Sequence, residues 1–163
     1  MDTLPPIELP DEAATADLAH RLAGWLKPGD VIALRGDLGV GKTSFARALI
    51  RALSDEGREV PSPTFTLVQS YETPAGPIHH FDLYRIQSPG ELTEIGWDEA
   101  LGSGIVLVEW PERAGNFLPV ARLDLTLEFG PTAGARRATF RPGPGWMTVH
   151  DGFSALQRER PGE

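Results

Sequence analysis

Apolar residues are spaced along this chain in two ways, one typical of helices and the other typical of buried strands. In residues 11–26 they recur every three or four positions, which predicts an amphipathic helix. Residues 43–53 have the same helical spacing. Residues 31–34 and 105–108 are short continuous apolar runs, as expected for strands that are covered on both faces. The chain therefore mixes helices with buried strands.

Two further pairs of segments alternate between apolar and polar residues, as half-buried strands do. Residues 65–71 and 78–84 are separated by a turn rich in proline and glycine, so they predict a hairpin. Residues 123–129 and 137–141 predict a second antiparallel pair, which closes the sheet.

Short helices are predicted between these strands. Ser88, Pro89 and Glu91 have the spacing of a capping box, with serine as the N-cap and proline at the first helical position. We expect a helix to begin there. Residues 97–101 and 111–117 predict two more short helices.

The order of these elements predicts an α/β fold, with a mixed parallel and antiparallel sheet flanked by helices. At 163 residues the chain has the length of a single domain. We expect this domain to span residues 11–141, after a flexible N-terminus at residues 1–10. The pattern weakens beyond it, and residues 142–163 form a C-terminal extension of unknown role.

The candidate chemistry begins in the glycine-rich segment that joins the strand at 31–34 to the helix at 43–53. Residues 36–43 fit G-x-x-x-x-G-K-[ST], the phosphate-binding loop, or P-loop, of nucleoside triphosphatases. Backbone N–H groups of such a loop surround the phosphates, and the helix N-terminus adds partial positive charge. We expect Lys42 to reach the β- and γ-phosphates and Thr43 to hold Mg²⁺. The positions expected to bind the nucleotide here are Gly36, Asp37, Leu38, Gly39, Val40, Gly41, Lys42, Thr43 and Ser44.

Two carboxylates end predicted strands, at the edge where open α/β sheets bind their ligands. Glu109 follows the apolar run 105–108, which is the Walker B pattern, and we expect it to bind Mg²⁺ directly or through a water. The alternative is a charge at the start of the predicted helix 111–117. Asp82 ends the segment 79–81. It is a catalytic or switch residue, a solvated strand-end carboxylate, or the partner of Arg85.

Thr64 follows two prolines in a connecting loop. In nucleotide switches a threonine on such a loop senses the γ-phosphate and Mg²⁺, whereas in an ordinary turn its hydroxyl caps the backbone. Both interpretations are open. The candidate catalytic residues are therefore Lys42, Thr64, Asp82 and Glu109.

His79 and His80 invite an interpretation as a metal site. Because successive side chains of a strand point to opposite faces, the two cannot bind one ion together from a regular strand. Zinc is not expected.

The lysines bear on the identity of the nucleotide. The chain has only two, Lys27 and Lys42, and Lys27 precedes the loop and is followed by Pro28. The N-K-x-D motif that reads guanine in Ras-like GTPases is therefore absent, which favours ATP.

Composition limits the partners. The formal net charge of −8 argues against a protein that binds DNA or RNA by itself. No segment approaches the roughly 20 apolar residues of a membrane span, and the N-terminus lacks the pattern of a signal peptide. The absence of cysteine fits a reducing compartment. We expect a cytoplasmic protein that is not bound to a membrane.

Four motifs occur in order along the chain: LRGDLGVGKT at residues 34–43, SPTFTL at 62–67, HFDLYR at 80–85 and VEWPER at 108–113. Together they resemble the TsaE family, the small ATPases of bacterial tRNA threonylcarbamoyladenosine biosynthesis, over residues 11–141.

This resemblance implies one α/β domain that binds ATP and Mg²⁺. It implies association with TsaD and TsaB, which transfer a threonylcarbamoyl group to adenosine 37 of tRNA. In the family, ATP hydrolysis is thought to reset the complex between turnovers, so contact with tRNA is only indirect.

The resemblance also implies residue roles. Lys42 and Thr43 serve phosphate and Mg²⁺, Glu109 serves the metal, and Thr64 and Asp82 support hydrolysis.

Three more positions match the family. Thr15 and Arg137 correspond to positions on the side of the nucleotide base, and Trp110 corresponds to a position tied to activity.

Two other functions are open. A P-loop kinase of small molecules would suit the length, although a mixed sheet with a hairpin after the loop fits a kinase poorly and only Arg136 and Arg137 resemble lid residues. A nucleotide-binding assembly module without useful hydrolysis is the second.

Overall fold

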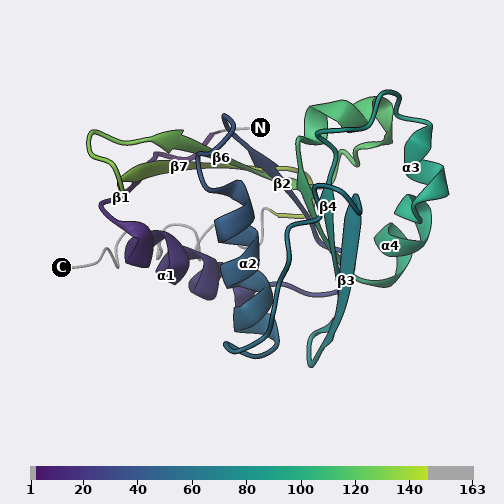
Figure 1. The fold of residues 1–163 in the computed structure, drawn as a ribbon, viewed down its shortest axis with the longest axis horizontal. Coiled ribbons are helices and arrows are strands. Elements are labelled where there is room, and N and C mark those ends of the chain that lie inside the picture. Colours follow the sequence, from purple (N-terminus) through teal and green to yellow (C-terminus); the bar gives the residue numbers. More distant parts are fainter. Residues whose placement is uncertain (1–2, 147–163) are drawn as a thin grey trace.

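The computed structural model describes residues 3–146, which form one sheet with helices on both faces (Figure 1). The helices are α1 (Glu12–Ala23), α2 (Lys42–Leu53), α3 (Glu91–Glu94), α4 (Trp97–Ser103) and the 3₁₀ helix η1 (Pro111–Phe117). The strands are β1 (Ile7–Leu9), β2 (Val31–Arg35), β3 (Val68–Thr73), β4 (Gly76–Asp82), β5 (Ile105–Glu109), β6 (Leu123–Phe129) and β7 (Arg136–Pro142).

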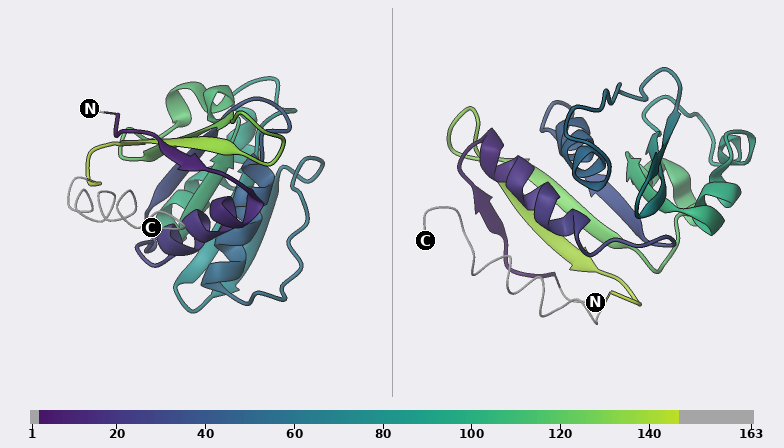
Figure 2. Two further views of the ribbon diagram at one scale, coloured as in Figure 1. Left: turned by 90° about the vertical axis from the view of Figure 1, so that its left-hand side faces the viewer. Right: turned by 90° about the horizontal axis from the view of Figure 1, so that it is seen from below.

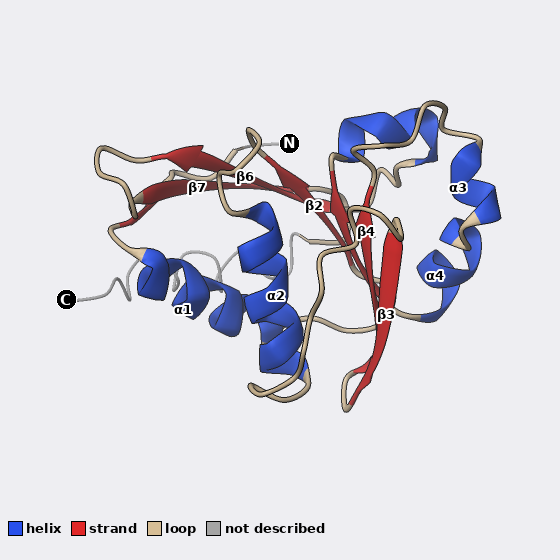
Figure 3. Cartoon of the chain, viewed as in Figure 1, coloured by secondary structure: helices blue, strands red, loops and turns tan. Residues whose placement is uncertain are grey.

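Parallel strands form the centre of the sheet, and antiparallel pairs form its edges (Figure 3). The strand order within the described residues is β1-β7-β6-β2-β5-β4-β3. Strand β2 is parallel to both β5 and β6, and β4 is parallel to β5. The pairs β3–β4, β6–β7 and β1–β7 are antiparallel. The predicted α/β fold with a mixed sheet flanked by helices is confirmed.

Helices α1 and α2 pack on one face of the sheet, and α3, α4 and η1 pack on the other (Figure 2). Alternate residues of β5 therefore enter different cores: Ile105 and Leu107 face α1 and α2, whereas Val106 and Val108 face the opposite layer. A strand covered in this way has no polar face, which explains its continuous apolar sequence.

Local signals set the limits of α1. Asp11 Oδ1 accepts a hydrogen bond from the N–H of Ala14 at 2.8 Å and caps the helix. Gly24 is the C-cap, so the helix ends at Ala23 and not at residue 26 as expected.

The short helix α3 begins later than the sequence predicts. The Glu91 carboxylate accepts hydrogen bonds from the N–H groups of Gln87 and Ser88 at 2.6 and 2.8 Å. The bond from glutamate back to the serine N–H, one of the two in the predicted capping box, therefore forms. Ser88 is not the N-cap, because the helix starts only after Gly90.

Among residues 3–146, no helix combines the length and the apolar character that crossing a bilayer requires.

The first hairpin is also displaced from its predicted position. Strand β3 begins at Val68 instead of residue 65, because Leu67 has a φ of 70°, outside the strand region. The N–H of Leu67 donates to the carbonyl of Pro63 at 2.7 Å, which makes a turn of the segment that carries Thr64.

The start of the chain is more ordered than predicted. Residues 1–10 were expected to be flexible, but Ile7–Leu9 pair with β7 as strand β1. Ile7 and Leu9 enter the core beside α1, because the alternation of the strand turns both toward that layer. The prediction of a flexible segment is wrong for these residues.

The predicted extension at residues 142–163 begins inside the fold. Strand β7 reaches Pro142, and Trp146 is buried in the core shared with α1 and α2. Residues 147–163 lie outside the part of the chain that the structure describes.

Leu9→Ala tests whether β1 is an integral strand. Leu9 is only 2% exposed, so its truncation should lower the free energy of unfolding by about 2–5 kcal/mol, measured by urea denaturation. Glu8→Ala is the matched control, because the exposed ion pair of Glu8 with Arg137 is worth at most about 1 kcal/mol. Equal small losses in both variants would contradict the burial of β1.

Candidate functional site

The loop between β2 and α2 needs glycine at three positions. A Cβ on Gly36 would lie 2.5 Å from the carbonyl oxygen of Leu127 and 2.8 Å from Val40 Cγ1. Gly39 and Gly41 have φ of 82° and 115°, a region that other residues rarely adopt. The backbone geometry therefore requires glycine at these positions, whether or not a ligand is bound.

The N-terminus of α2 is available to an anion. Gly41 is its N-cap, and no side chain of the described residues caps this end. The first turn contains no acidic residue. The leading N–H groups and the helix dipole therefore favour a negatively charged ligand.

Lys42 is held beneath an aromatic ring. Its Nζ donates to the carbonyl oxygens of Gly36 and Asp37 and lies 3.8 Å from the centroid of the Trp110 ring. Burial lowers the pKa of Lys42, and the negative charge of Glu109 opposes this shift. Trp110 itself has a φ of 57°, which is unusual for a bulky residue. No pattern in the sequence indicates this conformation.

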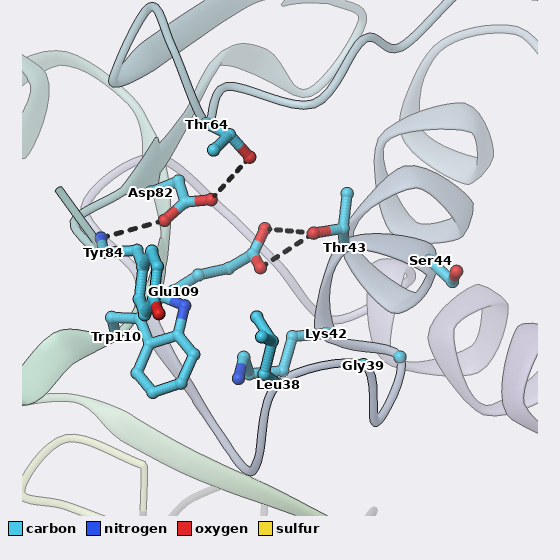
Figure 4. Close-up of a pocket in the computed structure, with 11 residues that line it drawn as sticks. Leu38, Gly39, Lys42, Thr43, Ser44, Thr64, Asp82, Tyr84, Glu109 and Trp110 are labelled. Carbon is cyan, nitrogen blue, oxygen red and sulfur yellow. Dashed lines mark hydrogen bonds between the residues drawn. The ribbon is translucent and has the colours of Figure 1, made fainter.

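Two carboxylates meet beside the loop. Asp82 and Glu109 are register partners on the parallel strands β4 and β5, so their side chains emerge on the same face. The Thr43 hydroxyl donates to the Glu109 carboxylate, with distances of 2.9 and 3.1 Å to its two oxygens (Figure 4). The structure thus brings together the loop and both strand-end carboxylates that the sequence singled out.

Asp82 is buried and hydrogen-bonded, which excludes the alternative of a solvated carboxylate. Its Oδ2 accepts from Thr64 Oγ1 at 3.2 Å and its Oδ1 from the N–H of Tyr84 at 3.0 Å. Burial raises the pKa of Asp82, the hydrogen bond from Tyr84 opposes this, and the charge of Glu109 adds to the rise. Arg85 instead stacks on the Phe65 ring at 4.5 Å.

The two histidines point to opposite faces of β4, as predicted. His79 contacts Ser70 and Ser103 on the side of α4. His80 is fully buried on the other side, where its Nε2 lies 2.6 Å from Glu109 Oε2. The sequence analysis missed this contact, although the spacing of two residues from Asp82 puts His80 on the face of the candidate site.

A cavity of about 300 Å³ lies over the carboxylates. Loop residues Leu38 to Ser44, apart from Val40, line one side, and Thr64, Asp82 and Glu109 line the other (Figure 4). Val40 is buried in the core. The rings of Tyr84 and Trp110, 4.9 Å apart, complete the wall.

A second cavity of about 560 Å³ continues past Gly39, Gly41 and Ser44 toward α1. Thr15, which the resemblance puts on the side of the nucleotide base, lines it. Arg137 does not, because its Nε donates to Glu8 Oε1 at 2.8 Å on the opposite face of β7.

Arg136, the residue before Arg137, lies on the face of β7 that borders this cavity. Its Nε donates to the carbonyl of Val40 at 2.6 Å, and it lines the second cavity. Since adjacent strand residues point to opposite faces, a shift of one position is enough to move an arginine out of the site.

The groups around the first cavity fit a hard divalent cation. Thr43, Asp82 and Glu109 offer only hydroxyl and carboxylate oxygens, the donors that Mg²⁺ prefers. The uncapped start of α2 lies against the same cavity and suits the phosphates that usually accompany this ion.

Comparison with known proteins identifies similar chains. Residues 9–138 match the family model described as "Threonylcarbamoyl adenosine biosynthesis protein TsaE". The Rickettsia felis protein named "tRNA threonylcarbamoyladenosine biosynthesis protein TsaE" is 43% identical over 120 residues, which cover 74% of this chain and 70% of the relative.

Two relatives with the same name come from other bacteria. The Aquifex aeolicus protein is 45% identical over 69% of this chain and 81% of its own length, and the Bacillus subtilis protein is 39% identical over 70% and 71%. The crystal structure of YdiB from Bacillus subtilis superposes with a TM-score of 0.74 at 27% identity, covering 96% of this chain and 95% of YdiB.

Asp82→Asn tests the electrostatics of the carboxylate pair. Because the folded pKa of Asp82 is raised above its ordinary 3.8, the folded wild type holds the proton more tightly than the unfolded chain and loses stability as pH rises between the two values. The neutral variant avoids this loss. We expect its free energy of unfolding in urea to exceed that of the wild type near neutral pH, and the gain to vanish below pH 3.8.

Asp37→Asn is the control, because the Asp37 side chain is exposed on the loop and should give no such gain. A net loss of stability in Asp82→Asn at neutral pH would contradict this account.

Proposed function

The chain belongs to the TsaE family, and we propose that it is a Mg²⁺-dependent ATPase that supports threonylcarbamoylation of adenosine 37 in tRNA through TsaD and TsaB. One observation carries the proposal: Thr43 of the glycine loop is hydrogen-bonded to Glu109, directly beside Asp82. A phosphate loop joined to a strand-end carboxylate is the arrangement by which P-loop enzymes hold nucleotide and metal together. The names of the relatives support the pathway.

The two cavities suit the two ends of ATP. The amides of residues 36–43 and the start of α2 would bind the phosphates in the smaller cavity, and Lys42 would exchange its carbonyl partners for phosphate oxygens. The larger cavity, lined by Thr15 and Arg136, would take the ribose and base. ATP is preferred to GTP because the chain has no N-K-x-D motif.

Thr43 and Glu109 would hold Mg²⁺, since both already meet at the edge of the smaller cavity. When bound, the ion supplies positive charge that offsets the charge on the phosphate oxygens. Glu109 is 2% exposed, so its charge acts in surroundings from which most water is excluded.

Asp82 would orient the water that attacks the γ-phosphorus. In that reaction the new P–O bond to water forms as the bond to the bridging β–γ oxygen breaks, giving ADP and phosphate. Burial raises the pKa of Asp82, which suits a group that accepts the proton of the water. The hydrogen bond from Thr64 holds the carboxylate in place.

Hydrolysis by the chain alone should be slow. Arginine is absent from the described residues that line the smaller cavity. Arg85 stacks on Phe65, and Arg113 donates to the carbonyl of Ile86 at 3.4 Å, and neither lines the cavity proposed for the phosphates. Without an arginine finger the charge of the transition state is poorly stabilised, and we propose that TsaD and TsaB complete the site.

The contacts of the two arginines near the β6–β7 turn weaken the kinase alternative. Arg136 is bonded to the carbonyls of Val40, Ala133 and Ala135, and Arg137 to Glu8, as expected for structural residues and not for a lid. The assembly-module alternative makes a different prediction, which is repeated modification without hydrolysis. We expect the protein to act in the cytoplasm, where its proposed tRNA target resides.

The test is the rate of ATP hydrolysis with and without TsaB–TsaD. We expect slow turnover by the isolated chain and stimulation by the partners. Lys42→Ala should lower the stimulated rate about 100-fold, as expected when a preorganised donor to the reacting group is removed. Lys27→Ala is the matched control, because Lys27 is the other lysine and is exposed.

Four outcomes would contradict the proposal. Fast turnover without partners would refute the need for them, and stimulation by a small-molecule acceptor would favour a kinase. Equal rates in Lys42→Ala and the wild type would remove the phosphate loop from the reaction. If Glu109→Gln supports modification at the wild-type rate, the assembly module is favoured.

A further inference from the structure

We propose that His80 is a positioning residue that fixes the Glu109 carboxylate and thereby sets the affinity of the site for Mg²⁺-bound nucleotide. The inference rests on the proposed role of Glu109 as a metal ligand. It assigns a function to a buried side chain that belongs neither to the glycine loop at residues 36–43 nor to the cavity walls.

The contact between the two side chains is short and shielded from water. His80 is 0% exposed and Glu109 is 2% exposed, and Nε2 lies 2.6 Å from Oε2. An ionised carboxylate can only accept, so the imidazole donates its Nε2–H. Hydrogen bonds to a charged acceptor are among the strong ones, and burial strengthens this bond further.

The other ring nitrogen shows that the histidine is not there for packing. Nδ1 of His80 is buried and has no hydrogen-bond partner within residues 3–146. A buried polar atom without a partner is unfavourable, and an apolar side chain would fill the same space without that cost. The bond to Glu109 is therefore the feature that distinguishes histidine from an apolar residue at this position.

The register of the sheet explains how His80 reaches Glu109. His80 lies opposite Leu107 on β5, and Asp82 lies opposite Glu109. All of these side chains face α2, so the imidazole extends diagonally toward the rim of the sheet. The bond anchors the end of Glu109 to β4, a second strand of the parallel centre.

This anchor matters because Glu109 has only two side-chain hydrogen-bond partners among the described residues, His80 and Thr43. If Thr43 turns its oxygen to a metal ion, its bond to Glu109 is weakened, and His80 becomes the group that keeps the carboxylate in place. Hydrogen-bonded partners of metal ligands act in this way generally, and their loss lowers metal affinity about 10–100-fold.

The experiment compares amide variants that differ in reach. The amide nitrogen of glutamine lies roughly where Nε2 of histidine lies, whereas that of asparagine is too short to donate to Glu109. The affinity for a non-hydrolysable ATP analogue is measured by calorimetry with Mg²⁺ and with EDTA, for the wild type, His80→Gln and His80→Asn. His79→Asn is the matched control, because that histidine faces the opposite layer.

We expect Mg²⁺ to tighten binding to the wild type, His80→Gln and His79→Asn by similar factors. In His80→Asn the tightening should shrink about 10-fold or more, while the affinity in EDTA stays at the wild-type level. A purely structural role would lower both affinities together, or neither.

A second measurement needs no ligand. Urea unfolding of His80→Asn, Glu109→Gln and the double variant gives the coupling between the two side chains. If His80→Asn does not fold, His80→Leu replaces it in both experiments, since leucine also lacks the donor and fills an apolar site.

Equal Mg²⁺ effects in the wild type and a folded variant without the donor would overturn the inference, as would zero coupling. A loss in His80→Gln as large as in His80→Asn would also overturn it, because the donor would then be irrelevant. Failure of the proposed function shows separately: the wild type itself would bind the analogue weakly or without response to Mg²⁺.

Discussion

The parallel pairing of β2 with β5, and of β5 with β4, is the constraint on which the site depends. Leu34 near the end of β2 lies opposite Glu109, and Glu109 lies opposite Asp82, so both carboxylates emerge where β2 gives way to the glycine loop. The hydrogen bond from Thr43 to Glu109 then ties the start of α2 to the central strand. A slip of one residue in either pairing would turn these side chains to the other face of the sheet.

Burial of Lys42 and Asp82 at this site lowers the stability of the folded chain. Burial pushes the pKa of Lys42 down and that of Asp82 up, so the folded state disfavours the charged form of both groups. Trp110 adopts a left-handed backbone conformation to lie over Lys42. Strain and buried charge of this kind are typical of sites selected for binding and catalysis, and the two apolar cores on either side of the sheet offset them.

The sequence predicted the features that depend on local chemistry. A few adjacent residues determine each of these features, so they were recognisable: the loop at residues 36–43, the central strands β2 and β5, and the carboxylates at the strand ends. Features set by distant partners were not. Ile7–Leu9 form a strand only because β7 offers an edge, and the hydrogen bond from His80 to Glu109 requires knowing that β4 lies beside β5. Arg136 and Arg137 differ only in the face of β7 on which they lie, which composition cannot reveal.

The most direct test of the central claim is a crystal structure of the chain with a non-hydrolysable ATP analogue and Mg²⁺. We predict that the triphosphate lies against the amides of residues 36–43, with Lys42 moved from the loop carbonyls to phosphate oxygens and with Thr43 and Glu109 at the metal. A nucleotide bound elsewhere, or a Glu109 side chain turned away from the loop, would contradict it.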